Sequence, residues 1–370
     1  MQKIEVKIPA KPQSSYVITV GDDFLGSLIG QIKTLLPNRE FFVITDANVV
    51  KAGLLEKLTT GIQLPCYVIS PAGEQSKNIG TITKIVEAME KNALGRDCAV
   101  IALGGGTVGD MAGFAAAIYK RGVPVIQIPT TTVAQADSSI GGKTGVDSSI
   151  SKNAYGAFYH PAAVFVDVAT LKTLDEKQFN CGLVESIKHA LIADGDYFDY
   201  LQKNVDDICD RKVKPLEYIA MKNCQIKAAV VEEDPYEKNK RRILNYGHTI
   251  GHAVESASEY EILHGQAVAI GIIAANIIER KLGLANTEER LTQIKQLFAK
   301  LNISLRIPAK ITKEQILDII SRDKKAVGKW PKFILLEKTG KVLCDGEQYA
   351  CNVKREIVEE TIEDILKEKY

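Results

Sequence analysis

The sequence has no excess of either positive or negative charge, no closely spaced pair of cysteines and no long apolar run. It has 47 Lys and Arg against 46 Asp and Glu, a formal net charge of +1 over 370 residues, so no overall field favours nucleic acid or an anionic membrane. The seven cysteines are scattered without a CxxC pair, which disfavours a disulfide framework or a cysteine zinc site and favours a reducing, cytoplasmic setting. No stretch approaches the roughly 20 apolar residues of a membrane helix. We therefore expect neither nucleic acid nor a membrane as a partner.

What is present is the composition of an ordinary globular protein, with 45% hydrophobic and 25% charged residues. Residues 1–8 alternate polar and apolar side chains, so we expect a strand there rather than a signal peptide. The length suggests two domains, at roughly 100–200 residues each, or one large α/β unit.

Short β-branched runs alternate with helical stretches early in the chain. The runs comprise residues 41–45, 66–70, 98–103, 125–128 and 164–167. They lack clean alternation, which favours parallel strands covered on both faces. From about Asp175 onwards helical spacing dominates, in residues 221–231, 243–258, 266–282 and 288–301. The expected fold is an α/β N-terminal domain with a doubly wound, mainly parallel sheet (residues 1–172) and a mainly α-helical C-terminal domain (residues 173–370).

A glycine-rich turn, Gly104-Gly105-Gly106, follows one of these runs and opens a helical stretch at 111–119. Glycines let the backbone approach a pyrophosphate, and a helix N-terminus offers free N–H groups. The turn is not GxGxxG, so a tight strand-to-helix turn is an equally open interpretation. Asp46, at an earlier strand end, could accept the ribose hydroxyls of NAD.

A second glycine-containing stretch runs from Asp137 to Thr144 and is closely followed by Lys152 and Asn153. It ends as a P-loop does, but the first glycine of GxxxxGK[ST] is replaced by Asp137, so a nucleoside triphosphatase is disfavoured. Two lysines and an amide fit a phosphate site. A solvated loop remains the alternative.

Three of the five histidines fall between residues 248 and 264. His248 and His252 share one helix face, and His264, at the start of the next helix, can lie beside them. With Glu185, two imidazoles would leave open positions on a divalent ion, as catalytic zinc requires. Helical histidines that only cap or pack are the alternative, and His160 and His189 fit that simpler interpretation.

Cationic residues precede the histidine helix. Residues 237–242, which include Arg241, are taken alone most simply interpreted as a solvated charged segment. However, an arginine guanidinium can form two parallel hydrogen bonds to a carboxylate or phosphate. Lys227 and residues 323–325 could add donors. These cations, the glycine turn, the two lysines of the second stretch and the histidine cluster together indicate a polyanionic substrate that undergoes redox chemistry beside a metal.

The chain resembles the 3-dehydroquinate synthases, members of the sugar phosphate cyclase group, nearly from end to end. The resemblance is carried by residues 71–77, 104–106, 109–110, 120–123, 129–131, 137–144, 152–153, Glu185, Lys188, Asn245, 247–248, His252 and 264–265. It implies a lyase of the shikimate pathway of aromatic amino acid biosynthesis. That enzyme converts 3-deoxy-D-arabino-heptulosonate 7-phosphate to 3-dehydroquinate and phosphate by transient oxidation with NAD+, elimination, reduction and aldol closure.

The resemblance also implies site residues in the C-terminal half and its surroundings. Metal ligands, for Zn2+ or alternatively Co2+, are Glu185, His248 and His264. Ring hydroxyls would meet Asp137, Lys188 and Asn245, and the substrate carboxylate would meet Lys227 and Arg241. The phosphate pocket is matched by Lys143, Asn153, His252 and one of Lys324 and Lys325, with Lys152 as a further lysine on the substrate side. Arg121 matches an arginine that reaches across a dimer interface, which implies a homodimer.

For NAD+, the resemblance implies residues of the N-terminal domain and the boundary segment. The adenosine side would meet Asp46 and Asn48, and the neighbouring loop offers Glu74 and Lys77. The pyrophosphate and nicotinamide would meet Gly105, Gly106 and Asp110, and the remainder would be lined by Thr130, Thr131, Thr170, Thr173 and Leu174.

Four positions depart from the family pattern: Asp147, Ser151, His160 and Gln266, the last of which replaces a usual Glu beside His264. They remove no expected metal ligand but leave room for an altered substrate. An aminodehydroquinate synthase, another sugar phosphate cyclase, a metal-dependent oxidoreductase like glycerol dehydrogenase and a non-catalytic NAD sensor stay open as alternatives.

Overall fold

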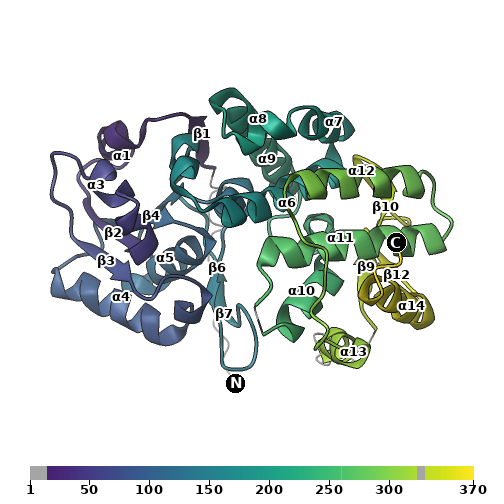
Figure 1. Cartoon of the computed structure of the whole chain (residues 1–370). Helices are drawn as coiled ribbons and strands as arrows, with labels where there is room; N and C mark the ends of the chain where they lie inside the picture. Colours follow the sequence, from purple (N-terminus) through teal and green to yellow (C-terminus); the bar gives the residue numbers. More distant parts are fainter. Residues whose placement is uncertain (1–14, 260, 323–329) are drawn as a thin grey trace, which may run out of the picture.

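A six-stranded parallel sheet forms the N-terminal half of the computed structural model, which describes residues 15–259, 261–322 and 330–370 (Figure 1). Its spatial order is β1-β8-β5-β4-β2-β3. The strands are β1 (Val17–Gly21), β2 (Glu40–Asp46), β3 (Cys66–Ile69), β4 (Cys98–Gly104), β5 (Val125–Pro129) and β8 (Ala163–Asp167). Five of them confirm the predicted runs, whereas β1 was not predicted. The strand expected at residues 1–8 lies outside the described residues.

Helices cover both faces of this sheet. They are α1 (Leu28–Leu35), α2 (Ala47–Lys51), α3 (Leu54–Leu58), α4 (Ile79–Lys91) and α5 (Gly106–Ile118). Successive residues of β2 alternate between two cores: Phe42 and Ile44 pack with α4 and α5, while Phe41 and Val43 pack with α1 and α3. Side chains that are buried on both faces explain why the strands lack a polar alternation, and the doubly wound prediction is confirmed.

The direction of strand addition reverses around β2, which pairs with β3 on one side and with β4 on the other. In open α/β sheets a crevice for ligands forms outside the carboxyl ends of the strands at such a reversal. Asp46 ends β2, and Gly104 ends β4. The sheet topology therefore brings Asp46 and the glycine turn to the same edge.

The C-terminal half is mainly helical, as predicted. Its helices are α6 (Glu176–Ala193), α7 (Gly195–Lys203), α8 (Val205–Cys209), α9 (Val213–Glu233), α10 (His248–Ala257), α11 (His264–Lys281), α12 (Thr287–Lys300), α13 (Lys313–Arg322) and α14 (Arg355–Leu366). Short strands also occur there: β9 (Lys332–Ile334), β10 (Leu336–Lys338), β11 (Lys341–Val342) and β12 (Ala350–Asn352). The division into two domains at residues 172 and 173 stays a prediction.

One predicted helix, 243–258, is wrong in its first part. Residues Lys240–Asn245 form a 3-10 turn, and α10 begins only at His248. Gly247 lies between them with φ +77°, a left-handed conformation that interrupts the helix. The interruption separates Arg241 and Asn245 from the helix that carries His248 and His252.

An antiparallel hairpin, β6 (Lys143–Val146) with β7 (Tyr155–Phe158), lies between the two halves of the molecule (Figure 1). No strand was predicted here; the sequence indicated a phosphate site, with a solvated loop as the alternative. The hairpin packs against α5 and places Lys143 at its first residue and Lys152 and Asn153 in its connecting turn.

Helices α10 and α11 approach each other at glycines. A Cβ on Gly271 would overlap the carbonyl oxygen of Gly247, and a Cβ on Gly251 would lie 2.8 Å from the carbonyl oxygen of Ala267. Because such distances exclude any side chain, the two helices pack backbone to backbone. This contact brings His248 and His252 close to the beginning of α11.

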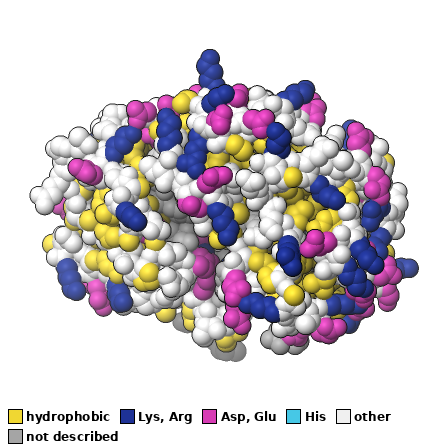
Figure 2. Space-filling model, viewed as in Figure 1, with side chains coloured by type: hydrophobic (Ala, Val, Ile, Leu, Met, Phe, Trp, Pro, Cys, Tyr) yellow, Lys and Arg dark blue, Asp and Glu magenta, His cyan; other side chains and the backbone are white. Residues whose placement is uncertain are grey.

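Charged side chains of both signs are interspersed over the face shown in Figure 2, in keeping with the net charge of +1. No helix among the described residues has the length and apolar character needed to cross a membrane.

We predict that Gly271→Ala destabilises the fold by about 3 kcal/mol, because its methyl group would overlap the backbone of Gly247. Thermal unfolding followed by circular dichroism measures the effect. Gly30→Ala is the matched control: Gly30 lies within α1, and no other group lies near the place that its methyl group would take, so we expect a gain of about 0.5 kcal/mol. Equal midpoints for the two variants would contradict the close helix contact.

Candidate functional site

The expected cofactor residues follow the carboxyl ends of the strands. Asp46 caps α2, and its Oδ1 accepts hydrogen bonds from the backbone N–H groups of Asn48 (2.9 Å) and Val49 (3.0 Å). Gly105 precedes the first residue of α5. Thr130 and Thr131 follow β5, and Thr170, Thr173 and Leu174 lie in or just after the turn that follows β8. The fold thus gathers these residues at one edge, with the N-terminus of α5 directed there.

Two of the threonine hydroxyls in this set donate hydrogen bonds to backbone carbonyls. Thr170 Oγ1 donates to the carbonyl of Asp167 at 2.7 Å, and Thr173 Oγ1 donates to the carbonyl of Thr170 at 2.9 Å. These hydroxyls stabilise the turn after β8.

Lys77 connects the loop after β3 with α5 and with the hairpin. Its Nζ lies 2.8 Å from Asp110 Oδ2 and donates to Asn153 Oδ1 at 2.8 Å. Burial lowers the pKa of this ammonium, but Asp110 and Glu74 outweigh burial and raise it above its ordinary value. Glu74 Oε2 accepts a hydrogen bond from Thr107 Oγ1 at 3.2 Å.

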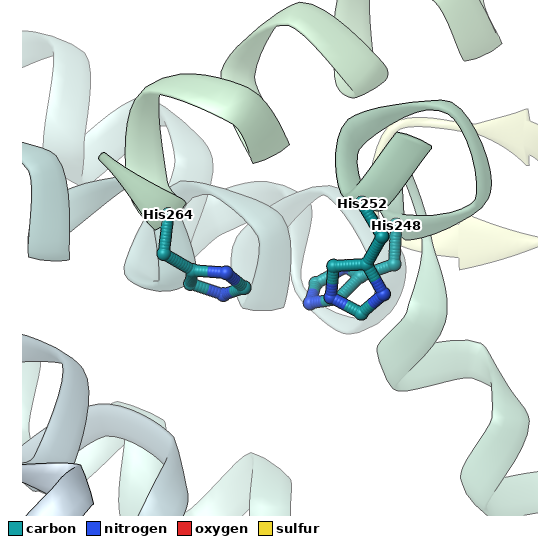
Figure 3. A group of neighbouring side chains, drawn as sticks. All are labelled: His248, His252 and His264. Carbon is teal, nitrogen blue, oxygen red and sulfur yellow. The ribbon is translucent and has the colours of Figure 1, made fainter. Parts of the chain in front are cut away.

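Three histidines converge at the start of α11. His248 and His252 project from one face of α10, and His264, the first residue of α11, points toward them (Figure 3). Their ring centroids are 4.9 to 5.7 Å apart, and each ring offers a nitrogen within 4.8 Å of the others. This grouping matches the arrangement predicted from the sequence.

Glu185, on α6, completes the cluster. Its side chain is 1% exposed, and its Oε1 lies 3.7 Å from His248 Nε2 and 3.5 Å from His264 Nε2. Lys188 Nζ is 2.5 Å from Oε2. Burial would raise the pKa of Glu185, but Lys188 and His264 outweigh burial and hold it well below its ordinary value. The carboxylate is therefore ionised while enclosed.

His248 and His264 share a ring orientation in which Nδ1 lies beside an oxygen atom and Nε2 faces Glu185. His248 Nδ1 lies 3.1 Å from the carbonyl oxygen of Tyr246, and His264 Nδ1 lies 3.5 Å from Glu255 Oε2. In a neutral imidazole, an acceptor beside Nδ1 favours the proton there and leaves Nε2 with a lone pair, the tautomer in which imidazole binds metals. Both Nε2 atoms face Glu185.

This set fits a divalent metal. Oε2 of Glu185 is paired with Lys188, whereas Oε1 meets the two imidazole nitrogens only at 3.5 and 3.7 Å and has no close hydrogen bond among the described residues, although buried carboxylate oxygens ordinarily have one. Burial would lower the pKa of His264, but Glu185 and Glu255 outweigh burial and raise it to about 9, so a metal would displace the proton on its Nε2. One carboxylate and two imidazoles then form a donor set typical of catalytic zinc. Two other groups, the three histidines and the set Asp137, Glu185 and His189, also bring three ligand atoms within 4.8 Å of one another, so the set of Glu185, His248 and His264 has two competitors.

Asp137 lies beside the metal set, on the π-helical turn Ala134–Ser138. Its Oδ1 is 2.7 Å from Lys227 Nζ and 3.6 Å from His189 Nε2. Burial would raise the pKa of Asp137, but Lys227 and Lys188 outweigh it and keep this pKa well below the ordinary value. His189 is fully buried and its Nδ1 lies 3.2 Å from Asn223 Oδ1.

Arg241 is 2% exposed and packs against the turn at Gly141. Its Nη1 donates to the carbonyl of Pro235 at 2.7 Å, whereas its buried Nε has no acceptor among the described residues. Gly141 has φ +91°, and a Cβ there would overlap Arg241 Nη2. The glycine is thus required both by the backbone conformation and by the guanidinium.

Glu237 joins two of the predicted substrate residues. Its Oε2 pairs with Lys143 Nζ, and its Oε1 accepts a hydrogen bond from Asn245 Nδ2 at 2.9 Å. The sequence pattern did not point to this carboxylate, because residues 237–242 stand out there only as a source of cations.

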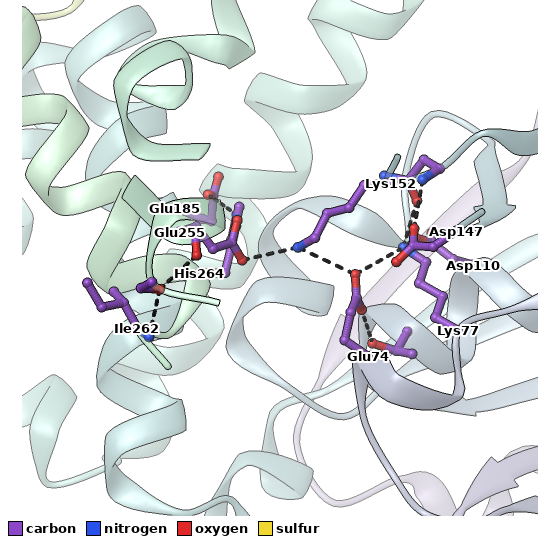
Figure 4. A network of polar contacts seen from close by, with 12 residues as sticks. Glu74, Lys77, Asp110, Asp147, Lys152, Glu185, Glu255, Ile262 and His264 are labelled. Atoms are coloured by element: carbon purple, nitrogen blue, oxygen red, sulfur yellow. Dashed lines mark hydrogen bonds and ion pairs between the residues drawn. The ribbon is translucent and has the colours of Figure 1, made fainter. Parts of the chain in front are cut away.

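Lys152 lies between the sheet side and the helical side. Its Nζ is 3.6 Å from Glu74 Oε1 and 3.2 Å from Glu255 Oε1 (Figure 4). Glu255 was also missed from the sequence. Its position three residues after His252 on α10 is the only signal that could have pointed to it.

Arg121, a further predicted residue, remains apart from this assembly. Arg121 is exposed at the end of the turn Tyr119–Arg121, and no hydrogen bond or ion pair joins it to the residues above within the described ranges. Lys324 and Lys325 lie outside the described residues.

Comparisons with known proteins agree with this architecture. The family models for the N-terminal and C-terminal parts of 3-dehydroquinate synthase match residues 67–181 and 182–326. A 3-dehydroquinate synthase of Ruminiclostridium cellulolyticum is 40% identical over 363 residues, covering 95% of this chain and 97% of the relative. That of Desulforamulus reducens is 45% identical over 347 residues, covering 92% and 95%.

Two solved structures are similar over nearly the whole chain. A 2-deoxy-scyllo-inosose synthase in complex with carbaglucose-6-phosphate, NAD+ and Co2+ has a TM-score of 0.82 at 28% identity, covering 93% of this chain and 95% of the other. A 2-epi-5-epi-valiolone synthase of Streptomyces hygroscopicus with NAD+ and Zn2+ has a TM-score of 0.87 at 25% identity, covering 98% and 100%.

We predict that Gly141→Ala weakens substrate binding, raising KM at least tenfold, because the methyl group would displace the Arg241 guanidinium. Steady-state kinetics measures it. Gly283→Ala is the control: Gly283 has φ +75°, but nothing lies within 4 Å of the place that its methyl group would take, so it shares the backbone strain without the contact and should leave KM unchanged. Similar KM values for both variants would show that Arg241 does not depend on Gly141.

Proposed function

The chain belongs to the 3-dehydroquinate synthase family, and we propose that it converts 3-deoxy-D-arabino-heptulosonate 7-phosphate to 3-dehydroquinate and inorganic phosphate. In this reaction NAD+ accepts a hydride from the substrate and later returns it, so no net oxidation occurs. The C–O bond to phosphate breaks by elimination, and an intramolecular aldol closure forms the carbocycle.

One observation carries the proposal: ionised Glu185 is enclosed by His248, His264 and Lys188, and further buried cations lie nearby. Lys227 and Arg241 are 4% and 2% exposed, and the Arg241 Nε has no acceptor among the described residues. Lys227 is paired with Asp137, so the free donor is that of the Arg241 guanidinium, and a buried guanidinium favours an anionic ligand. A neutral polyol, such as the substrate of a glycerol dehydrogenase, would leave this positive charge without a negative partner from the ligand.

Glu185, His248 and His264 would hold Zn2+ or Co2+, which as a Lewis acid would lower the pKa of the substrate hydroxyl that is oxidised. NAD+ would lie along the carboxyl edge of the sheet, with its pyrophosphate at Gly105 and Gly106, where the N-terminus of α5 offers N–H groups.

The remaining residues bind and orient the substrate. Lys227 and Arg241 face its carboxylate, and Asp137, Lys188 and Asn245 take its ring hydroxyls. Asp137 stays ionised beside Lys227, so it can accept a hydrogen bond from a hydroxyl. The phosphate group is bound by Lys143, Asn153 and His252, with Lys152 beside them and one of Lys324 and Lys325 as a further donor.

Burial lowers the pKa of His252 to about 4, and the neighbouring His264 adds to the effect. His252 is therefore neutral near pH 7, and it offers one N–H donor to a phosphate oxygen rather than a charge.

The protein would act as a homodimer in which Arg121 reaches the partner's site, which accounts for its exposure and its lack of a partner within the described part of the chain. Seven free cysteines suit a reducing, cytoplasmic compartment.

We predict that purified protein supplied with NAD+, Zn2+ and the heptulosonate phosphate releases phosphate without accumulating NADH. Coupled phosphate detection and absorbance at the NADH band measure the two products together. Net NADH formation would instead indicate a dehydrogenase, and absence of turnover would indicate a sensor. A higher kcat/KM for the amino analogue of the substrate would reassign the enzyme to the aminodehydroquinate synthases.

We also predict that His264→Ala abolishes bound metal and lowers kcat at least 100-fold while NAD+ affinity stays within twofold of wild type. Metal content by mass spectrometry and NAD+ titration measure these effects. His252→Ala should retain the metal and raise KM, because we assign His252 to phosphate. Loss of metal in both variants would contradict the division of the histidines between metal and phosphate.

A further inference from the structure

Glu255 carries a carboxylate to an enclosed position beside the histidine cluster. It lies on α10, one turn beyond His252, and is 5% exposed. A buried carboxylate destabilises the fold unless it is paired. Each of its two oxygens faces a different functional residue, and these residues come from separate segments of the chain.

The first contact is with His264. Glu255 Oε2 lies 3.5 Å from His264 Nδ1, while His264 Nε2 lies 3.5 Å from Glu185 Oε1 on the other side of the ring. An acceptor beside Nδ1 fixes a proton there and orients the ring, so Nε2, the nitrogen that would give up its proton to a metal, faces Glu185. His248 obtains the same orientation from the backbone carbonyl of Tyr246. His264 begins its helix, and its Nδ1 contact comes from a side chain instead.

The second contact is with Lys152. Glu255 Oε1 lies 3.2 Å from Lys152 Nζ, which also lies 3.6 Å from Glu74 Oε1 (Figure 4). Glu74 in turn accepts a hydrogen bond from Thr107 Oγ1 at the beginning of α5. A row of charges therefore runs from the glycine turn of the sheet to the first residue of α11, and Glu255 is its last carboxylate before the histidines.

We propose that Glu255 is a positioning residue that orients His264 for the divalent metal and holds Lys152 on the substrate side with the same carboxylate. The metal part of this inference rests on the proposed function. Glu74, the other carboxylate on Lys152, makes no contact with a histidine among the described residues, so the two acids differ in their expected effect on the metal.

The test compares Glu255→Gln with Glu74→Gln in the full-length protein. Zn2+ affinity is measured by competition with a chromophoric chelator, and Co2+ loaded in place of Zn2+ reports the ligand field by visible absorption. We expect Glu255→Gln to weaken Zn2+ binding 10- to 100-fold and to change the Co2+ spectrum. Glu74→Gln should leave both within twofold of wild type.

Wild-type Zn2+ affinity in Glu255→Gln, or equal weakening in both variants, would overturn the proposal. If Glu255→Gln does not fold, Glu255→Asp replaces it: this variant keeps the charge but shortens its reach, and Zn2+ binding at least fivefold weaker supports the proposal whereas wild-type affinity refutes it. No substrate is needed for these measurements. Failure of the proposed synthase activity is therefore distinguishable from failure of this inference.

Discussion

The enclosed carboxylate of Glu185 is the interaction on which the rest of the site depends. A buried ion costs several kcal/mol unless its surroundings compensate it, and Glu185 has Lys188 at 2.5 Å and the Nε2 atoms of two histidines at 3.5 and 3.7 Å. These partners come from α6, α10 and α11, so the packing of three helices fixes the geometry. The contact between Gly247 and Gly271 lets α10 and α11 approach closely enough for this.

Much of the fold could be predicted because the sheet is buried on both faces. Residues 98–104 of β4 are buried throughout, and such runs are recognisable without alternation. The start of α10 could not be predicted, since the apolar spacing continues through Gly247 and only its left-handed backbone reveals the break. The β6–β7 hairpin was missed because its lysines and glycines resemble those of a loop.

The candidate site was predictable where the residue type itself carries chemistry, as in the three histidines and Glu185. The roles of Glu237 and Glu255 could not be predicted, because each depends in part on one partner more than 90 residues away, Lys143 for Glu237 and Lys152 for Glu255. The sequence drew attention to Gln266 as a change in charge beside the metal site. The structure places the carboxylate of Glu255 at His264 Nδ1, from the preceding helix.

The central claim is that Glu185, His248 and His264 form one metal site between the helices and the sheet edge. Crystals grown with Zn2+ and NAD+, measured on both sides of the zinc absorption edge, test it most directly. We expect a single anomalous peak bounded by the Nε2 atoms of His248 and His264 and by the Glu185 carboxylate. A peak between Asp137, Glu185 and His189, or none at this cluster, would contradict it.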